Sequence, residues 1–294
     1  MRWIAGIFLV LFLATSAGAS GGAIGPFKDE LFAYPKILQR SKDGTYTVVE
    51  YNRDRDLVSR DRVLRWKAHY RYVDQSVRWS RKVRSYKSVN GKFKYFAVGG
   101  PKRSTEFAVI YVHGKGGNRR QGVNDWTFGG NFNRLQNLVT RNNGALYTPD
   151  FSGFKDRGTQ DIAALIDVAR KNSPSARIIV ACGSMGGGVC WRLAKNPTHA
   201  AKIGGLFLLG SHWHDDFLKS PVLKKSTPNI PIYIGHGSQD PVFQPAVQRD
   251  FYKKILAKNR KYPIRFVMFE TGAHGTPIRM VDWRQELNWM LSQP

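Results

Sequence analysis

Cysteine and acidic residues are scarce in this sequence of 294 residues. Two cysteines exclude a small fold held by many disulfides and a zinc module built from cysteine ligands alone. Only 21 Asp and Glu stand against 46 Lys and Arg, which gives a formal net charge of +25. A surplus of this size indicates an anionic partner, surface or substrate and carries no information about the fold. With 42% hydrophobic and 13% aromatic residues, the chain still has enough apolar material for a full core.

Long hydrophobic runs are missing after the first 20 residues, whereas spanning a bilayer takes about 20 apolar residues. The beginning of the chain has a pattern of its own: Arg2 precedes an apolar stretch at residues 3–13, and residues 17–19 read Ala-Gly-Ala. This pattern predicts a signal peptide over residues 1–19 with cleavage before Ser20. The apolar stretch is too short for a membrane anchor, and no cysteine follows it as in a lipoprotein. We expect a soluble protein that is periplasmic or secreted.

After the predicted signal peptide the chain divides into a short lead-in and a basic segment. Residues 20–35 are rich in glycine and are expected to be flexible. Residues 36–105 hold 19 Lys and Arg against six Asp and Glu. Within them, residues 85–96 are typical of a hairpin that turns at Asn90-Gly91. We predict that residues 36–105 are a basic β extension, the antiparallel start of a larger sheet.

From residue 106 onward, apolar runs of strand length alternate with segments of helical periodicity. Strands are expected at residues 107–112, 145–147, 177–181, 205–209, 230–234 and 264–269, and helices at residues 132–139, 162–169, 189–195, 251–257 and 281–291. Such alternation predicts an α/β fold, with a mostly parallel central sheet and helices on both faces. No internal repeat or low-complexity segment interrupts it.

The clearest chemical signal is a serine among glycines between a strand and a helix. Residues 182–186 read Cys-Gly-Ser-Met-Gly and follow an apolar strand. A nucleophile elbow needs this context, because its sharp turn lifts the serine hydroxyl clear of the sheet. A glycine-rich turn without chemistry would look the same locally, so Ser184 needs support from elsewhere in the chain.

That support comes from two residues at later strand ends. Asp240 lies on the loop after the strand at residues 230–234, and His274 follows the strand at residues 264–269. Functional groups of open α/β sheets collect beyond the carboxyl ends of the strands. In the order Ser-Asp-His, His274 would take the proton of Ser184, and Asp240 would hold the imidazole and stabilise its charged form.

A fourth strand end carries His113-Gly114-Lys115-Gly116-Gly117. Small residues allow backbone N–H groups to turn toward a serine and form half of an oxyanion hole. An ordinary glycine loop is the alternative. A nucleotide-binding P-loop is excluded, because the required spacing and the Ser or Thr after the lysine are absent.

Taken together, these motifs resemble the α/β-hydrolase superfamily, in particular its carboxylesterase, dienelactone-hydrolase and lysophospholipase-like branches. The resemblance covers residues 106–294 and rests on His-Gly-x-Gly-Gly at 113–117, the elbow at 182–186, His-Gly-x-x-Asp-x-Val at 236–242, and Gly-x-His-Gly at 272–275. It implies that residues 106–294 are a catalytic core that needs no metal or organic cofactor.

The resemblance also implies a role for each matching residue. Ser184 would be the nucleophile, Asp240 the acid and His274 the base. The backbone N–H groups of Met185 and Lys115 would form the oxyanion hole. The departure from the superfamily pattern is Cys182, which stands where the elbow usually has its first glycine.

The two cysteines, Cys182 and Cys190, flank the elbow at a separation of eight residues. A disulfide is compatible with an exported protein, provided that strand and helix bring the Cα atoms within about 7 Å. We favour two buried free thiols instead. His212 and His214 form a His-x-His pair, but without a third ligand at a telling spacing we predict no metal site.

Residues 115–128 form a long strand-to-helix loop that could serve as a lid, a substrate wall or an ordinary surface loop. Its Arg119 and Arg120 could bind an anionic group of a substrate, and Trp126 could line the pocket. His212 follows another strand and is a further candidate for substrate contact.

Three functional hypotheses remain open. The first is an esterase that acts on a small-molecule or lipid ester, in contact with an anionic membrane or cell-envelope polymer. The second is a peptidase or amidase that uses the same residues. The third is a catalytically idle protein that binds an anionic polymer. Nucleic acid is a weaker option, because no recognised module accompanies the basic and aromatic residues. The sequence does not determine the oligomeric state.

Overall fold

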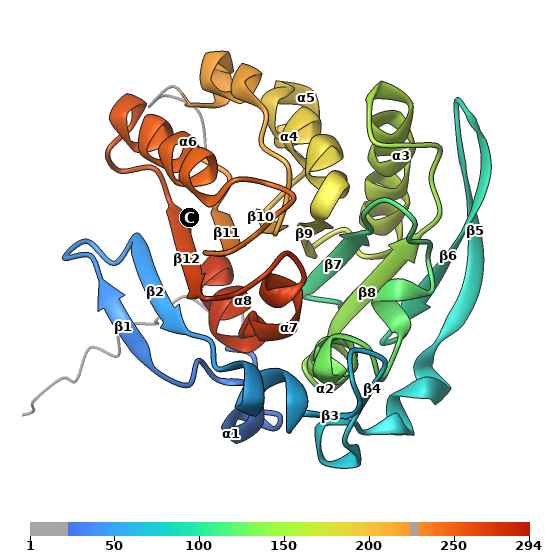
Figure 1. Cartoon of the computed structure of the whole chain (residues 1–294). Helices are drawn as coiled ribbons and strands as arrows, with labels where there is room; N and C mark the ends of the chain where they lie inside the picture. Colours follow the sequence, from blue (N-terminus) through green and yellow to red (C-terminus); the bar gives the residue numbers. More distant parts are fainter. Residues whose placement is uncertain (1–22, 224–228) are drawn as a thin grey trace, which may run out of the picture.

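The computed structural model describes residues 23–223 and 229–294 (Figure 1). The predicted signal peptide, residues 1–19, lies outside the described residues. Within the part of the chain that is described, no helix is both long enough and apolar enough to cross a membrane.

One large sheet organises the described residues, with its strands in the order β1-β2-β12-β11-β10-β9-β7-β8-β6-β5. Neighbours from β2 to β8 are parallel, and antiparallel pairs complete both edges. The predicted mostly parallel sheet is therefore confirmed. Its strands are β1 (Ile37–Arg40), β2 (Tyr46–Glu50), β5 (Lys82–Ser88), β6 (Gly91–Val98), β7 (Phe107–Val112), β8 (Gly144–Pro149), β9 (Arg177–Gly183), β10 (Gly205–Leu209), β11 (Ile232–Gly237) and β12 (Ile264–Glu270).

Helices cover both faces of this sheet (Figure 1). One core cluster packs α3, α4 and α6 on one face, and a second packs α2, α7 and α8 on the other. Because both faces are covered, β7, β8, β10 and β11 are buried along their whole length, which explains their continuous apolar runs. The helices are α1 (Asp29–Phe32), α2 (Asn131–Arg141), α3 (Asp156–Asn172), α4 (Gly187–Lys195), α5 (Pro197–Ala200), α6 (Pro245–Lys258), α7 (Thr276–Met280) and α8 (Trp283–Ser292).

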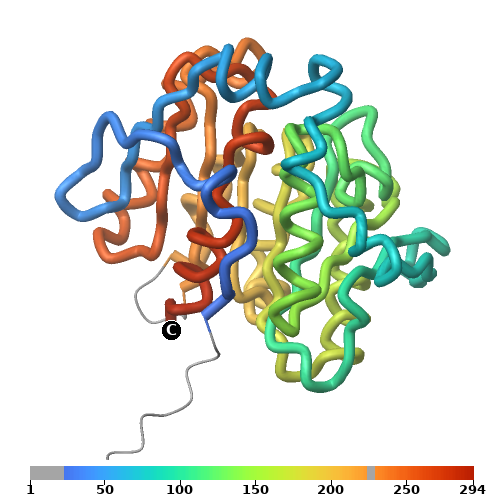
Figure 2. The backbone as a smooth tube through the Cα atoms, turned by 90° about the horizontal axis from the view of Figure 1, so that it is seen from below, coloured from blue at the N-terminus to red at the C-terminus, as the bar shows by residue number. Residues whose placement is uncertain are grey.

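The described part of the lead-in, residues 23–35, packs against the rest of the fold, where we expected a flexible segment. Ile24 is buried, its N–H donates to Asn288 Oδ1 at 2.7 Å, and its carbonyl accepts from Arg284. Figure 2 shows this segment running alongside α8. A glycine-rich pattern by itself does not distinguish a flexible linker from a packed segment.

The basic segment at residues 36–105 contributes to both edges of the sheet. Strands β1 and β2 join one edge next to β12, whereas β5 and β6 form a hairpin at the opposite edge next to β8. The predicted hairpin is present, but its two-residue loop is Val89-Asn90, since Ser88 pairs with Gly91. Between these pairs, β3 (Asp61–Val63) and β4 (Lys67–Ala68) form a separate two-stranded sheet.

Candidate active site

Ser184 lies at the sharp turn from β9 into α4. Its φ of 51° falls in the left-handed region, which a residue with a side chain adopts only under local constraint. Glycines allow the close packing that imposes this turn. A Cβ at Gly186 would lie 2.7 Å from the carbonyl oxygen of Val112, and one at Gly187 would lie 2.6 Å from that of His212. The turn therefore has the strained geometry of the predicted elbow.

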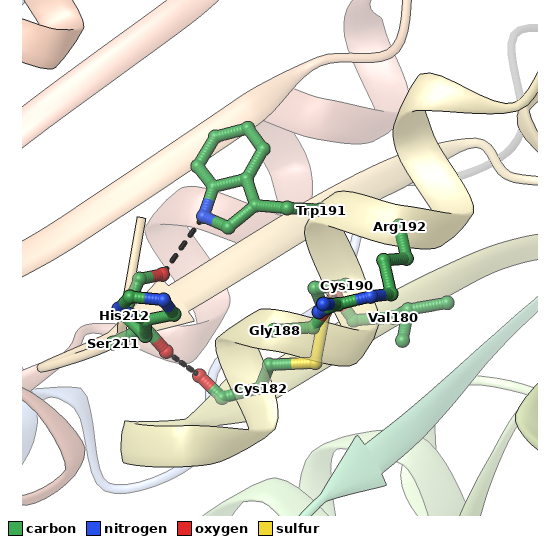
Figure 3. The surroundings of a disulfide bond; sticks show 8 residues. All are labelled: Val180, Cys182, Gly188, Cys190, Trp191, Arg192, Ser211 and His212. Carbon is green, nitrogen blue, oxygen red and sulfur yellow. Dashed lines mark hydrogen bonds between the residues drawn. A yellow bond between two sulfur atoms is a disulfide. The ribbon is translucent and has the colours of Figure 1, made fainter. Parts of the chain in front are cut away.

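A disulfide joins Cys182 to Cys190 across this turn (Figure 3). Our preference for two free thiols was wrong. The helix turns back over the strand, so that the two Cα atoms are 6.3 Å apart, within the range that a disulfide bridges. The bond thus ties the strand before Ser184 to the helix after it.

The three predicted side chains meet at the carboxyl ends of β9, β11 and β12. Asp240 Oδ2 lies 2.8 Å from His274 Nδ1, and His274 Nε2 lies 2.9 Å from Ser184 Oγ. Since a carboxylate only accepts hydrogen bonds, Nδ1 carries the proton in this pair. In the neutral ring Nε2 is then free to accept the hydrogen bond of the Ser184 hydroxyl. Asp240, His274 and Ser184 thus form one continuous chain of hydrogen bonds from the carboxylate to the hydroxyl, which we call the row.

The environment of Asp240 keeps its carboxylate ionised. Burial raises the pKa of Asp240, but the hydrogen bonds from His274 and from the N–H groups of Val242 and Phe243 outweigh it, so the net pKa lies below the usual value. His236, whose Nε2 donates to the carbonyl of Phe243 at 2.8 Å, lies against the same carboxylate. Burial lowers the pKa of His236, which keeps this neighbour neutral.

The glycine segment after β7 passes directly beside the serine. A Cβ at Gly114 would lie 2.8 Å from Ser184 Cβ and 3.3 Å from Ser184 Oγ. The next residue, Lys115, is exposed, and Met185 on the other side of the serine is half-buried. The structure therefore brings both segments of the predicted oxyanion hole to the serine.

Residues 128–278 match the model of the dienelactone hydrolase family, and this stretch is just over half of the chain. It contains Ser184, Asp240 and His274. The chain belongs to the dienelactone hydrolase family. Membership of this family indicates that the protein is a hydrolase of ester bonds.

Solved α/β hydrolases share the fold of this family member. The Pyrococcus furiosus esterase Pf2001 is 15% identical with a TM-score of 0.53, covering 72% of this chain and 91% of that one. A Clostridium thermocellum feruloyl esterase module, complexed with sinapinate, is 15% identical with a TM-score of 0.57 and coverages of 72% and 88%. Xanthomonas campestris XC6422, described as a serine hydrolase without lid, is 14% identical with a TM-score of 0.53 and coverages of 72% and 94%. No curated protein matches the chain.

Two arginines of this dienelactone hydrolase family member, Arg119 and Arg120, are candidates for binding an anionic group of a substrate, and Arg119 is already paired with a carboxylate. The guanidinium of Arg119 pairs with Asp150, and the Arg119 N–H donates to the same carboxylate at 2.9 Å. Arg120 is exposed and stays the candidate for an anionic substrate group. The loop is also fastened to the sheet, because Thr148 donates to the carbonyl of Arg119 and Tyr111 donates to Gln121. These contacts hold the loop against the sheet, and its role as a lid or a substrate wall stays a prediction.

Trp126 and His212 have different neighbours in the structure. His212 is adjacent to the serine, since the His212 N–H donates to the carbonyl of Ser184 at 3.1 Å and the His212 carbonyl accepts from Trp191 (Figure 3). Trp126 packs instead against Tyr70, with ring centroids 5.4 Å apart. The backbone of His212 therefore adjoins the serine, and contact of His212 or Trp126 with a substrate stays a prediction.

Aromatic rings that we did not predict lie against His274 and against the segments next to the serine and to His274. The ring of Phe243 lies 5.5 Å from that of His274, and Phe151 lies 4.5 Å from His113. A Cβ at Gly275 would lie 3.6 Å from the ring of Phe128. Their position gave a usable signal, because Phe151 and Phe243 also lie in loops that follow strands of the parallel sheet.

Among the described residues, no group of three or more His, Cys, Asp or Glu side chains is arranged to hold a metal ion. His214 lies 3.7 Å from Asp216, and burial lowers the pKa of both His212 and His214. His212 thus adjoins the elbow through its backbone, whereas His214 lies against Asp216.

Proposed function

We propose that the protein is an exported serine esterase that cleaves carboxylic esters through an acyl-Ser184 intermediate. The observation that carries the proposal is the hydrogen-bonded row from Asp240 through His274 to Ser184 Oγ, with distances of 2.8 and 2.9 Å. It ends on a serine in strained backbone geometry at the end of a parallel strand. An ionised carboxylate, an oriented imidazole and an accessible hydroxyl are the parts of an activated nucleophile.

In the first half of the reaction, His274 Nε2 takes the hydroxyl proton as Ser184 Oγ attacks the carbonyl carbon of the ester. The tetrahedral intermediate collapses, and the leaving alkoxide takes the proton from His274. In the second half, His274 takes a proton from water, which attacks the acyl carbon. The carboxylic acid leaves as Ser184 regains its proton. Asp240 stabilises the imidazolium that forms in each half.

The N–H groups of Met185 and Lys115 would stabilise the oxyanion. The passage of Gly114 against Ser184 supports this assignment, because it places the backbone of the 113–117 segment beside the attacked carbonyl. The ring-lined surroundings favour an apolar or aromatic acyl group. Sinapinate, which the feruloyl esterase module binds, is a reasonable model for such a group.

Two observations support export. Residues 1–19 have the pattern of a signal peptide. The Cys182–Cys190 disulfide also fits an oxidising compartment, where such bonds persist. We therefore propose a periplasmic or secreted location.

The test is labelling of the purified protein with a fluorophosphonate probe, together with turnover of p-nitrophenyl acetate and of a sinapinate ester. We expect labelling and turnover in the wild type and in Ser175→Ala, whose serine is exposed and remote from the row. Ser184→Ala should lose both, and Asp240→Asn should lose roughly 10⁴-fold in kcat, because an amide cannot hold the required tautomer of His274.

Wild-type labelling without ester turnover, but with turnover of amide analogues, would replace the esterase by an amidase. An unlabelled, correctly folded wild type would contradict an activated serine altogether and favour an idle polymer-binding protein.

A further inference from the structure

Large apolar side chains gather on one exposed hairpin outside the site. We call residues 58–71, which contain β3 and β4, the basic-aromatic hairpin. Trp66 at its tip is 74% exposed and Tyr70 is 57% exposed. The exposed large hydrophobic residues of this hairpin are Val58, Val63, Leu64, Trp66 and Tyr70. These apolar side chains remain exposed to water in the folded protein. A group of exposed apolar side chains of this kind indicates an interaction surface.

The same hairpin is positively charged. Arg62, Arg65 and Arg71 are exposed, and Lys67 is half-buried. Its one acid, Asp61, is buried and paired with Arg279, so the hairpin exposes no carboxylate of its own. The cations also surround Tyr70: Arg62 Nη1 donates to its hydroxyl at 3.2 Å, and Lys67 Nζ lies 5.5 Å from the ring centre.

Tertiary contacts connect the hairpin to the rest of the fold. Asp61 Oδ2 accepts from the N–H of Arg65 at 2.7 Å, which fixes the tip, while both Asp61 oxygens bind Arg279 at 2.9 and 2.7 Å. Arg279 lies on α7, the short helix that begins two residues after His274. The hairpin is therefore anchored to α7, the helix that follows His274 in the chain.

A second chain of contacts leads from the hairpin to the site. The N–H of Ala68 donates to the carbonyl of Trp126 at 3.0 Å, and Tyr70 packs edge-on against the Trp126 ring. Two residues on, Phe128 reaches Gly275, the neighbour of His274. The short turn Phe128–Gly130 contacts both β4 and α7 and so lies between the hairpin and the segment after His274. These contacts connect the hairpin to Gly275, the residue after His274.

We propose that the basic-aromatic hairpin docks the protein on bilayers that contain anionic lipid. Leu64 and Trp66 would enter the interfacial region, while Arg62, Arg65 and Arg71 bind lipid phosphates. Trp and Tyr partition to the membrane interface, and each Arg or Lys near an anionic surface adds attraction that is lost at high salt. The overall charge of +25 has the same sign.

Docking would bring ester-bearing amphiphiles to Ser184, and this consequence rests on the proposed esterase function. It names a substrate class: esters presented at an anionic lipid surface. Docking itself is independent of catalysis, so the two are measured separately.

The test is cosedimentation of the purified protein with vesicles of phosphatidylcholine, alone or mixed with phosphatidylglycerol. We expect binding only to the mixed vesicles, and weaker binding as salt rises. Leu64→Ser/Trp66→Ser should lower the partition constant at least roughly tenfold, because the apolar tip is lost. Arg62→Gln/Arg65→Gln should lower it by a similar factor, since each charge contributes roughly fivefold.

Matched controls lie elsewhere on the surface. Trp79→Ser removes a tryptophan that is 88% exposed outside the hairpin, and Lys253→Gln/Lys254→Gln removes two exposed charges from α6. Both controls should bind like the wild type. Equal losses in controls and hairpin variants would overturn the assignment of the docking surface to the hairpin. So would a wild type that binds heparin but no vesicle, which would indicate a soluble anionic polymer.

Two substrates separate docking from catalysis. The hairpin variants should hydrolyse soluble p-nitrophenyl acetate at the wild-type rate but lose activity on an ester embedded in mixed vesicles. Wild type that binds vesicles without hydrolysing either ester contradicts the esterase and leaves docking intact. Wild type that hydrolyses the soluble ester but binds no vesicle contradicts docking alone.

Discussion

At the residue scale, the approach of Gly114 to Ser184 leaves no room for a side chain. A methyl group at position 114 would lie 2.8 Å from Ser184 Cβ, a distance that real Cβ atoms essentially never show. Gly114→Ala must therefore displace the serine or the neighbouring Lys115 backbone. We expect a loss in kcat of about 10²-fold or more, because donors of this kind act only when correctly placed.

Gly275→Ala is the matched control for this change. Gly275 also adjoins the row and has φ of −82°, but an added Cβ would meet only an ordinary contact at 3.6 Å. Steady-state kinetics on a p-nitrophenyl ester and a thermal melt should show near-normal values for this variant. If the two variants lost equal activity, crowding of the serine would not be the cause.

His236 gives a second prediction at this scale, for stability against pH. Its buried ring has a pKa below the ordinary value of about 6.5. Below about pH 6.5 the unfolded chain therefore binds a proton that the folded chain does not, so stability is lost as the pH falls toward the folded pKa. When the pH is lowered from about 7 to about 5, the free energy of unfolding should therefore fall less in His236→Gln than in the wild type. Urea denaturation at the two pH values measures this, and equal losses would show that His236 is not linked to folding.

At the scale of elements, the Cys182–Cys190 disulfide connects β9 to α4 around the serine. Both sulfurs are buried, and the closed loop is short. Chain-entropy arguments give such a loop about 2–3 kcal/mol of stabilisation. Cys182→Ala/Cys190→Ala should therefore lower the free energy of unfolding by about this amount and reduce kcat, because the strand and helix that hold the elbow are no longer joined.

Reductant provides the comparison. The wild type should become less stable and less active in dithiothreitol once its disulfide opens, whereas the double variant should not respond. A wild type with the same denaturation midpoint in reductant, after thiol titration has shown two free cysteines, would mean that packing alone holds the elbow.

At the scale of the whole molecule, one buried ion pair joins segments that are far apart in the chain. Asp61 and Arg279 are both buried and connect β3 to α7. Asp61→Asn keeps the shape but leaves the guanidinium without its carboxylate, which costs about 3–5 kcal/mol in a buried site. Asp54→Asn, at an exposed carboxylate nearby, should change stability by no more than about 0.5 kcal/mol. Urea denaturation distinguishes the two, and a small effect of Asp61→Asn would mean that water reaches Arg279.

Local patterns predicted much of the architecture on this same scale. Continuous apolar runs identified the fully buried strands β7, β8, β10 and β11, because a strand covered on both faces is apolar along its length. The position of residues 36–105 could not be predicted in this way. These residues are contiguous in sequence but occupy opposite edges of the sheet. Either edge can accept a strand with one apolar face, and the spacing of strands along the chain does not determine which edge a strand joins.

Sequence alone determined the core of the site. Ser184, Asp240 and His274 each follow a strand of a parallel sheet, and the carboxyl ends of such strands lie at one edge, so local pattern implied spatial proximity. Tertiary structure decided what depends on distances between segments: the disulfide, the Arg119–Asp150 pair, the aromatic rings around His274 and the exposure of the basic-aromatic hairpin. Whether a side chain is buried or paired depends on the two segments that meet at it. The sequence of either segment alone does not show which other segment it meets.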